Sequence, residues 1–216
     1  MKPKPEDLTE VLRRLAEAEA AARYERSVHR RTHAARLPVL KTLEQFDWSW
    51  PKKINRAQIQ DLFRLRFVEQ NSNVVFMGGV GLGKTHFALA LAHSACLNNV
   101  PTLFTQAVEI VNTLSAAQAT NALSRTLKSY VAPRLLVIDE LGYLPMDKRG
   151  ADLLFQVISA RYERSATVLT TNLAYKHWAR IFNNDATLAT AILDRLVHHC
   201  ETVTIEGKSF RSEKDE

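Results

Sequence analysis

Cysteine and long apolar runs are both scarce in this sequence, and each shortage excludes a class of protein. The two cysteines among 216 residues, Cys96 and Cys200, stand in apolar contexts; they form no disulfide framework and are typical of buried thiols in a reducing compartment. No apolar run approaches the roughly 20 residues that span a bilayer, and the start of the chain lacks the apolar core of a secretion signal. We therefore expect a cytoplasmic protein that has no membrane partner.

Acidic residues are in deficit in only one part of the chain. Residues 1–66 hold 15 Lys and Arg against 9 Asp and Glu, whereas residues 67–216 hold 14 of each. The whole formal net charge of +6 therefore belongs to the first third of the chain. A basic segment joined to a neutral domain indicates an arm that binds a polyanion; the alternative is a helix surface whose charges are only solvated.

The order of apolar segments predicts an α/β fold. Buried strands are expected at 73–77, 102–105, 135–140, 167–172 and 201–207, with helices at 84–99, 107–118, 151–163 and 187–199. Because strands that alternate with helices form parallel sheets, we expect a three-layer α/β/α domain with a five-stranded, mostly parallel sheet.

The basic first third is predicted to be helical. Apolar residues recur on one helical face from Leu8, and no helix breaker lies between Leu8 and Pro38. A further helix is expected from Ile59 toward residue 70. We divide the chain into a basic helical N-terminal segment, residues 1–45, and an α/β domain, residues 46–216.

Glycine is also scarce, and four of the seven glycines fall within residues 78–83. The segment GGVGLGKT matches the GxxxxGK[ST] pattern, with an apolar strand before it and a helical stretch after it. Glycines let backbone N–H groups turn inward around phosphate oxygens, and the helix N-terminus adds partial positive charge. The sequence therefore predicts a P-loop that binds ATP. The expected nucleotide contacts are Gly78, Gly79, Val80, Gly81, Leu82, Gly83, Lys84, Thr85 and His86.

Catalytic and metal-binding roles follow from residues at the P-loop and at the end of a second strand. Lys84 is expected to reach the β- and γ-phosphates, and the Thr85 hydroxyl to bind Mg²⁺. The stretch LLVIDE supplies Asp139 and Glu140 directly after four apolar residues. Asp139 is predicted to hold Mg²⁺ through water, and Glu140 to polarise an attacking water. This pair favours ATP hydrolysis and disfavours a small-molecule kinase.

Two polar residues farther along the chain are candidates for assisting hydrolysis. If the sheet is ordered as in this P-loop subclass, Asn172 lies beside the acidic pair and contacts the γ-phosphate or the attacking water; the alternative is a turn asparagine. Arg195 follows the P-loop by about 110 residues, and we expect it to act at the site of a neighbouring subunit. The alternative for Arg195 is a surface pair with Asp194.

Zinc ligands are not expected at His198, His199 and Cys200. Adjacent side chains do not point at one centre, and no second ligand pair has suitable spacing. His86, beside the P-loop, and Trp178 are most simply packing residues.

Five segments taken together resemble the IstB-like AAA+ ATPases, helper proteins of insertion-sequence transposition. They are GGVGLGKTHFALAL, LLVIDELGYLP, ADLLFQVISARYER, VLTTN and ATAILDRLVHHCETVTIEGKSFR. The likeness covers residues 37 to 211, and DELGYLP and ILDRLVHHC are its specific parts. DnaC-type helicase loaders and, further off, DnaA-like initiators are related families.

The resemblance implies an ATP-dependent protein that oligomerises on double-stranded DNA, as a ring or a helical assembly, and directs a transposase. It implies that Asn172 is a sensor residue and Arg195 an arginine finger. Only nine residues follow Gly207, so we expect no C-terminal lid domain. The P-loop reads Gly-Gly-Val-Gly where the family more often has Gly-Pro-Pro-Gly, and the N-terminal region looks shorter than is usual in the family.

DNA contacts are expected from the basic first third. Phosphate contacts from its cations would give affinity that is independent of sequence and sensitive to salt. The candidates are Arg30, Arg31, Arg36, Lys41, Lys52 and Lys53. An alternative function is a DnaC-like helicase loader in DNA replication, which would differ in the partner that the N-terminal region binds.

Overall fold

Five parallel strands form the centre of the molecule. The computed structural model describes residues 5–51 and 53–210, and its sheet has the strand order β2-β3-β4-β1-β5. The strands are β1 (Asn73–Gly78), β2 (Thr102–Gln106), β3 (Leu135–Leu141), β4 (Ala166–Thr171) and β5 (Cys200–Ile205). All neighbouring strands are parallel, so the carboxyl ends of β1, β3 and β4 meet at one edge of the sheet. The predicted five-stranded α/β fold is confirmed.

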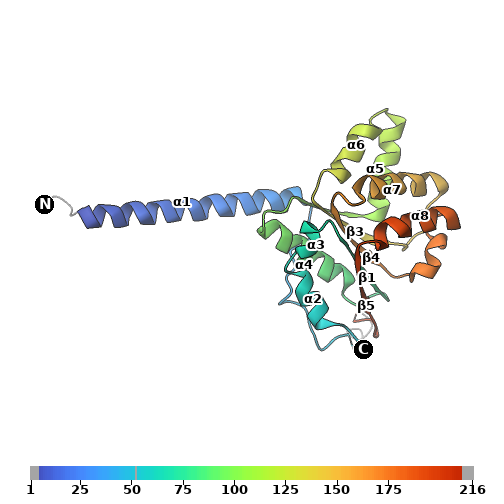
Figure 1. Ribbon diagram of the computed structural model, residues 1–216, viewed down its shortest axis with the longest axis horizontal. Coiled ribbons are helices and arrows are strands. Elements are labelled where there is room, and N and C mark those ends of the chain that lie inside the picture. Colours follow the sequence, from blue (N-terminus) through green and yellow to red (C-terminus); the bar gives the residue numbers. More distant parts are fainter. Residues whose placement is uncertain (1–4, 52, 211–216) are drawn as a thin grey trace.

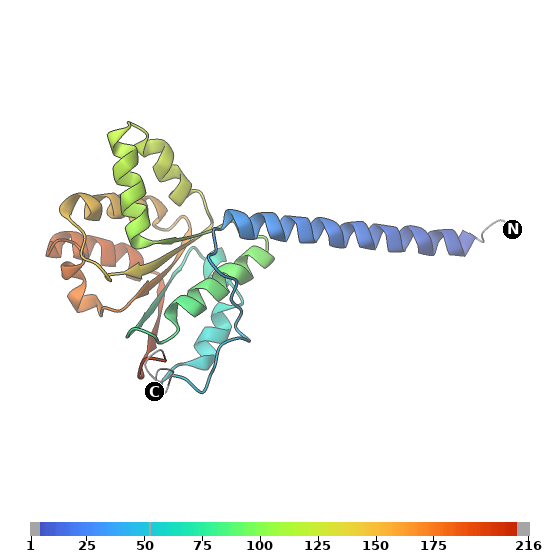
Figure 2. The ribbon, with the colours of Figure 1, turned by 180° about the vertical axis from the view of Figure 1, so that it is seen from behind.

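Helices cover both faces of the sheet (Figures 1 and 2). One face carries α2 (Arg56–Leu62), α3 (Arg66–Glu69) and α4 (Lys84–Leu97). The other carries α5 (Ala107–Ala119), α6 (Leu123–Val131), α7 (Lys148–Arg161), the 3₁₀ helix η1 (Tyr175–Arg180) and α8 (Ala186–Val197). Because side chains alternate along a strand, Val74 and Phe76 of β1 enter the first core and Val75 enters the second.

Most side chains of helix α4 are apolar and buried. Other parts of the chain cover the helix on more than one side. The sheet lies against one side of it. The rings of Phe46 and Trp48, from the segment ahead of α2, lie 4.2 and 5.9 Å from the ring of Phe87. At the other end of α4, Nε of Arg31 donates to the carbonyl of Cys96 at 2.7 Å. The start of the chain is thereby packed onto the helix that follows the P-loop.

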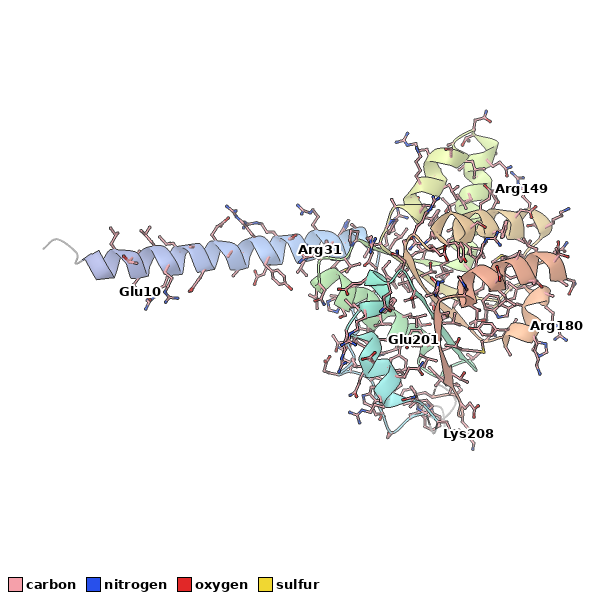
Figure 3. The ribbon with its side chains drawn as sticks, in the orientation of Figure 1. Glu10, Arg31, Arg149, Arg180, Glu201 and Lys208 are labelled. Atoms are coloured by element: carbon pink, nitrogen blue, oxygen red, sulfur yellow. The ribbon has the colours of Figure 1, made fainter. Side chains whose placement is uncertain are left out.

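Helix α1 (Pro5–Ala34) projects from the body as a long rod (Figures 1 and 2). Its inner end contacts the rest of the protein, where the hydroxyl of Tyr24 donates to the carbonyl of Leu97 at 3.1 Å. Figure 3 shows Glu10 far out on the rod and Arg31 where the helix reaches the body. We call residues 8–23 the outer helix.

Three local features differ from the expectations. The helix expected beyond Ile59 is divided into α2 and α3, because Leu65 adopts a left-handed conformation with φ of 58°. Helix α6 was not predicted. Residues 35–45, assigned to the N-terminal segment, pack on the body: Ala35 is fully buried, and its carbonyl accepts from the N–H of Phe104 at 2.8 Å.

Both cysteines are free thiols. Burial raises the pKa of Cys200 to about 11 and raises the pKa of Cys96 above its usual value. Thiolate is therefore scarce at neutral pH, as in structural cysteines. Across the residues that the structure describes, no helix has the length and apolar character needed to cross a membrane.

Candidate functional site

The P-loop joins β1 to α4 at the carboxyl edge of the sheet. Gly81 and Gly83 have φ of 76° and 84°, in the left-handed region that other residues rarely adopt. A Cβ on Gly83 would also lie 2.6 Å from Cε2 of Phe46. The loop therefore requires glycine at these two positions. Gly83 is the N-cap of α4, whose first N–H groups have no partner within the helix and are available to an anion.

Beneath the loop, the side chains of Thr85, Asp139 and Thr170 form one hydrogen-bonded group. The Thr85 hydroxyl lies 3.0 and 3.2 Å from the two carboxylate oxygens of Asp139. The Thr170 hydroxyl donates to the same carboxylate at 2.5 Å. Asp139 is only 3% exposed, so these hydroxyls replace the water that a buried carboxylate loses. Three segments that are distant in sequence thus meet at one carboxylate.

Thr85 and Asp139 offer the oxygen donors that Mg²⁺ prefers. Their oxygen atoms lie 3.0 and 3.2 Å apart, within hydrogen-bond distance, so the residues fit an ion that Thr85 binds directly and Asp139 holds through a water. Nζ of Lys84 donates to the carbonyl of Gly79 at 2.6 Å, within the same loop.

Glu140 follows Asp139 with a left-handed backbone, at φ of 59°. Such a conformation is costly for a residue with a side chain, and here the N–H of Glu140 is held by the Thr170 hydroxyl at 2.9 Å. Oε2 of Glu140 accepts from Nε2 of Gln106 at 3.2 Å. The sequence did not indicate Gln106, which reaches Glu140 because β2 is the neighbour of β3.

A pocket of about 140 Å³ connects the P-loop to the tip of β4. Asn172 lines it together with Lys84, Thr85 and Glu140, so the structure brings this predicted residue to the acidic pair. The remaining lining residues are Val80, Gly81, Tyr143, Thr170 and Thr171.

A second pocket, of about 540 Å³, opens on the other side of the P-loop. Its volume is that of a small-molecule site. P-loop residues 81–86 form one wall. The other residues are Lys41, Gln45, Phe46, Asp47, Trp50 and Phe210, which come from the segment ahead of α2 and from the chain after β5. Sequence reasoning did not single out the lining residues from this segment other than Lys41 as part of a site, although the aromatic residues clustered between 46 and 50 were a usable signal.

His86 fastens the first segment of this pocket to α4. Its Nε2 lies 2.9 Å from the carbonyl of Thr42, and its ring meets that of Phe46 edge to face at 5.4 Å between centroids. Burial lowers the pKa of His86, which favours the neutral ring. His86 therefore packs against the segment ahead of α2, as expected, and it also lines the large pocket beside the P-loop.

Arg195 lies away from the P-loop of its own chain. It belongs to the last turn of α8, which leads into the amino end of β5, whereas the P-loop is at the carboxyl edge. Its guanidinium lies over the ring of Phe155, 4.9 Å from the centroid, and donates to the carbonyl of Ala191 at 2.8 Å. The structure does not bring Arg195 to the site around Asp139.

The predicted DNA contacts have different environments. Arg30 and Arg36 are exposed, whereas Arg31 is half-buried and bonds to Ser27 and Cys96. Arg31 thus forms a joint between α1 and α4, and its contact with DNA stays a prediction.

The lysines in that group also differ from one another. Lys41 lines the large pocket beside the P-loop, and its contact with DNA stays a prediction. Lys53 is exposed and pairs with Glu206 at 3.1 Å. Lys52 lies outside the described residues.

The chain was compared with known protein families, and one family model matches residues 5–216, the model of the IstB-like ATP binding protein. The chain belongs to this family. A protein of *Pseudomonas aeruginosa* named for ATP binding in insertion sequence IS21 is 42% identical over 189 residues, which cover 88% of this chain and 71% of the relative. A protein of *Bacillus thuringiensis* subsp. *berliner*, named in the same way for IS232, is 40% identical over 94% of this chain and 80% of its own.

Solved structures share the fold of this IstB-like chain. DnaI superposes with a TM-score of 0.65 at 19% identity, over 77% of this chain and 91% of its own. AMPPCP-bound DnaA from *Aquifex aeolicus* gives a TM-score of 0.65 at 17% identity and 79% coverage of this chain. This chain spans about half the length of that DnaA chain, 51%. At these identities the likeness is one of fold.

Proposed function

We propose that this IstB-like protein binds and hydrolyses ATP, oligomerises on double-stranded DNA and directs or activates a transposase. The carboxylate of Asp139, bonded to Thr85 of the P-loop and to Thr170 of β4, is the observation that carries the ATP site. The names of the IS21 and IS232 relatives support ATP binding in the context of insertion sequences. We take the working division as a basic N-terminal segment, residues 1–45, and an ATPase domain, residues 46–216.

The proposed binding step uses the loop and both pockets beside it. The N–H groups at the start of α4 donate to phosphate oxygens, and Lys84 exchanges the carbonyl of Gly79 for the β- and γ-phosphates. The pocket of about 540 Å³, with Phe46 and Trp50 in its wall, receives the base and ribose. Thr85 and Asp139 would hold Mg²⁺, which neutralises charge that develops on the phosphates.

The proposed hydrolytic step uses the smaller pocket. Glu140 accepts a proton from the attacking water, and Gln106 restrains the carboxylate until ATP and water are in place. Asn172 orients the water or the γ-phosphate from the tip of β4. Because Arg195 lies toward the opposite edge of the sheet, we assign its guanidinium to the ATP of a neighbouring subunit in the assembly, where it stabilises negative charge.

Two partners complete the proposal. Arg30 and Arg36 are exposed cations of the basic segment and are assigned to DNA phosphates, with Lys53 as a third. A transposase is favoured over a replicative helicase as the protein partner, because the relatives at 40 and 42% identity are named for insertion sequences. The likeness to DnaI rests on fold alone.

ATP turnover by single variants and by mixed subunits tests the proposed site. Glu140→Gln should bind ATP normally and hydrolyse it about 10²–10⁴-fold more slowly, since it loses the general base. Arg195→Ala should be slow as well, and mixing it with Glu140→Gln should restore part of the activity. In the mixture, a subunit with Arg195→Ala still has Glu140, and a neighbouring subunit with Glu140→Gln supplies the intact Arg195 to its ATP.

Binding of labelled ATP by Lys84→Ala completes this experiment. It should fall well below that of the matched control Lys176→Ala, which changes an exposed lysine on η1. Normal turnover in Glu140→Gln would remove the catalytic assignment. Absence of rescue in the mixture, with both variants assembled, would remove the action of Arg195 between subunits.

DNA binding is tested by its dependence on salt. Arg30→Glu with Arg36→Glu should weaken binding to a random-sequence duplex and reduce the slope of log K against log salt by about two, one for each lost phosphate contact. The control is Arg164→Glu with Arg180→Glu, which makes the same charge change at exposed arginines of the ATPase domain. Equal slopes in the two double variants would show that the first pair does not contact phosphates.

A further inference from the structure

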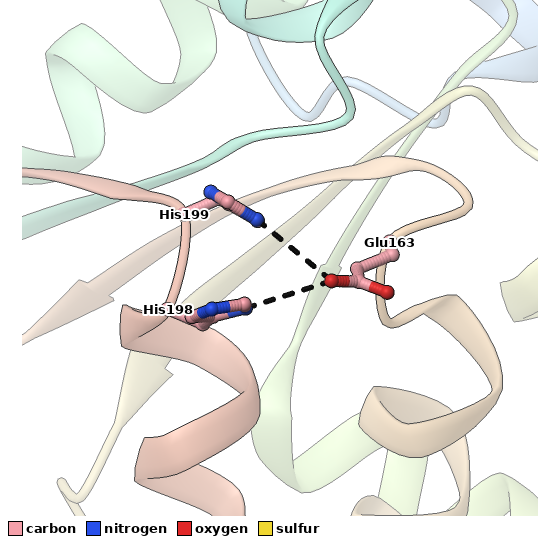
Figure 4. Close-up of side chains that lie close together, drawn as sticks. All are labelled: Glu163, His198 and His199. Carbon is pink, nitrogen blue, oxygen red and sulfur yellow. Dashed lines mark ion pairs between the residues drawn. The ribbon is translucent and has the colours of Figure 1, made fainter.

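Glu163, His198 and His199 meet near the edge of the sheet opposite the P-loop (Figure 4). Glu163 follows the end of α7, His198 ends α8, and His199 directly precedes β5. One ligand atom from each of the three lies within 4.8 Å of the others. The expectation that adjacent histidines do not point at one centre is wrong here, because the chain turns from helix to strand between them and both rings approach one carboxylate.

The separations are close to those between atoms bound to one ion. Oε1 of Glu163 lies 3.6 Å from Nδ1 of His198 and 3.8 Å from Nε2 of His199. Ligand atoms at about 2.0–2.2 Å from a tetrahedral ion are about 3.4 Å from one another. All three side chains are about half exposed, so small rotations can close the difference.

The backbone that carries the ligands is held in place. The carbonyl of Glu163 accepts from Nδ2 of Asn71 at 3.3 Å, and the carbonyl of His199 accepts from the N–H of Asn73 at 2.7 Å. The third ligand is fixed by its place at the end of α8. The cluster therefore joins three elements of the fold without depending on a long loop.

We propose that Glu163, His198 and His199 bind a divalent transition-metal ion of the Zn²⁺, Co²⁺ or Ni²⁺ type. Two imidazoles and one carboxylate suit these ions, whereas Mg²⁺ prefers oxygen ligands alone. Three protein ligands leave a coordination position for water. The hydroxyl of Tyr162, 2.8 Å from Nδ1 of His198, must move aside, because the single lone pair of that nitrogen cannot bind the ion and accept a hydrogen bond together.

This site is separate from the ATP site of its own chain. His199 is next to Cys200, which pairs with Asn73 at the amino end of β1, whereas Gly78 of the P-loop pairs with Ile205 at the other end. Five residue steps of strand, about 17 Å, lie between those two ends. Binding of the metal can therefore be measured without reference to ATP.

Zn²⁺ titration of the full chain, freed of metal with a chelator, tests the proposal by calorimetry. His29 and His33 form an exposed i, i+4 pair on α1 and could bind the same ion, so the parent protein carries His29→Ala and His33→Ala. This parent should bind one Zn²⁺ per chain. His199→Ala or Glu163→Gln should weaken binding tenfold or more, since loss of a mere supporting group already costs about 10–100-fold.

His177→Ala, on η1, is the matched control and should leave Zn²⁺ affinity unchanged. Visible absorption of bound Co²⁺ should report a tetrahedral site in the parent and lose intensity in His199→Ala. Retained ATP binding and helix content would show that each variant is folded. Failure of the parent to bind Zn²⁺, or an unchanged affinity after both His198→Ala and His199→Ala, would overturn the proposal.

Discussion

The outer helix and the α/β body contain arginines that are stabilised in opposite ways. In the outer helix, Arg13 and Arg14 both pair with Glu10, and all three side chains are exposed. In the body, Arg161 is only 2% exposed and donates to Thr167 and to backbone carbonyls at the end of α6, in the loop before β3 and at the start of β4. The first helix is supported by its own neighbours in sequence, whereas the body is supported by contacts between distant segments.

The apolar residues of the outer helix and of the body also differ in their surroundings. Leu8, Val11, Leu12 and Leu15 recur at helical spacing, and all are 52–61% exposed. On α7, apolar residues at similar spacing are buried against the sheet. A periodic apolar pattern therefore predicted a helix in both regions, but it did not tell whether the apolar face would meet a core.

The largest effect on stability is expected at Arg161, the buried arginine of the body. Arg161→Leu would leave the carbonyls of Tyr130, Pro133 and Ala166 without this donor, and should lower the free energy of unfolding by about 3 kcal/mol. Burial lowers the pKa of Arg161 to about 10, in keeping with its removal from water. Urea unfolding measures the change. Arg164→Leu, at an exposed arginine three residues on, should change it by less than about 0.5 kcal/mol.

A smaller effect is expected at the joint between the two regions. Arg31→Met removes the bonds to Cys96 and Ser27 and should cost about 1 kcal/mol of stability. Hydrogen exchange should increase in residues 24–34 and remain slow in the sheet. Arg30→Met, at the exposed neighbour, should change neither quantity; a similar loss in both variants would contradict the role given to this joint.

The smallest effect is expected in the outer helix and should depend on pH. Bonding to Arg13, and then to Arg14, lowers the pKa of Glu10 below its ordinary value. Since the folded-state pKa is lowered, the stabilisation is present at neutral pH and is lost as pH falls through that lowered pKa. Hydrogen exchange of the outer helix should therefore speed up in acid.

Glu10→Gln should abolish this pH response near the outer end of α1 and leave the unfolding of the body unchanged. The control is Glu25→Gln, since Glu25 makes no ion pair within the part of the chain that the structure describes. A change in the stability of the body would show that the outer helix is coupled to it.

Sequence reasoning found much of the candidate site, because its chemistry is encoded in short stretches. Lys84 and Thr85 follow the glycine loop directly, and Asp139 and Glu140 end one apolar strand. Gln106 escaped prediction because nothing in its own surroundings marks it. It approaches Glu140 only through the pairing of β2 with β3, where Gln106 lies opposite Asp139.

Other departures came from competition between local and distant interactions. Leu65 interrupts a helix that the apolar spacing favoured, since its left-handed backbone allows α2 and α3 to pack separately into the first core. Lys41 and Arg31 looked equivalent to the neighbouring cations in sequence. Lys41 lines a pocket because the segment after α1 folds back over the body, and Arg31 bonds to α4 because the inner end of α1 packs there.

The sequence alone determined the alternation of strands and helices, the glycine loop and the acidic pair, because each depends on residues that are close together in the chain. Tertiary structure decided which side chains share a site: Gln106 with Glu140, the segment at 41–50 with the P-loop, and Glu163 with two histidines. These contacts depend on the order of the strands in the sheet and on the places where the chain turns back. Both are set by the need to bury the two faces of the sheet together.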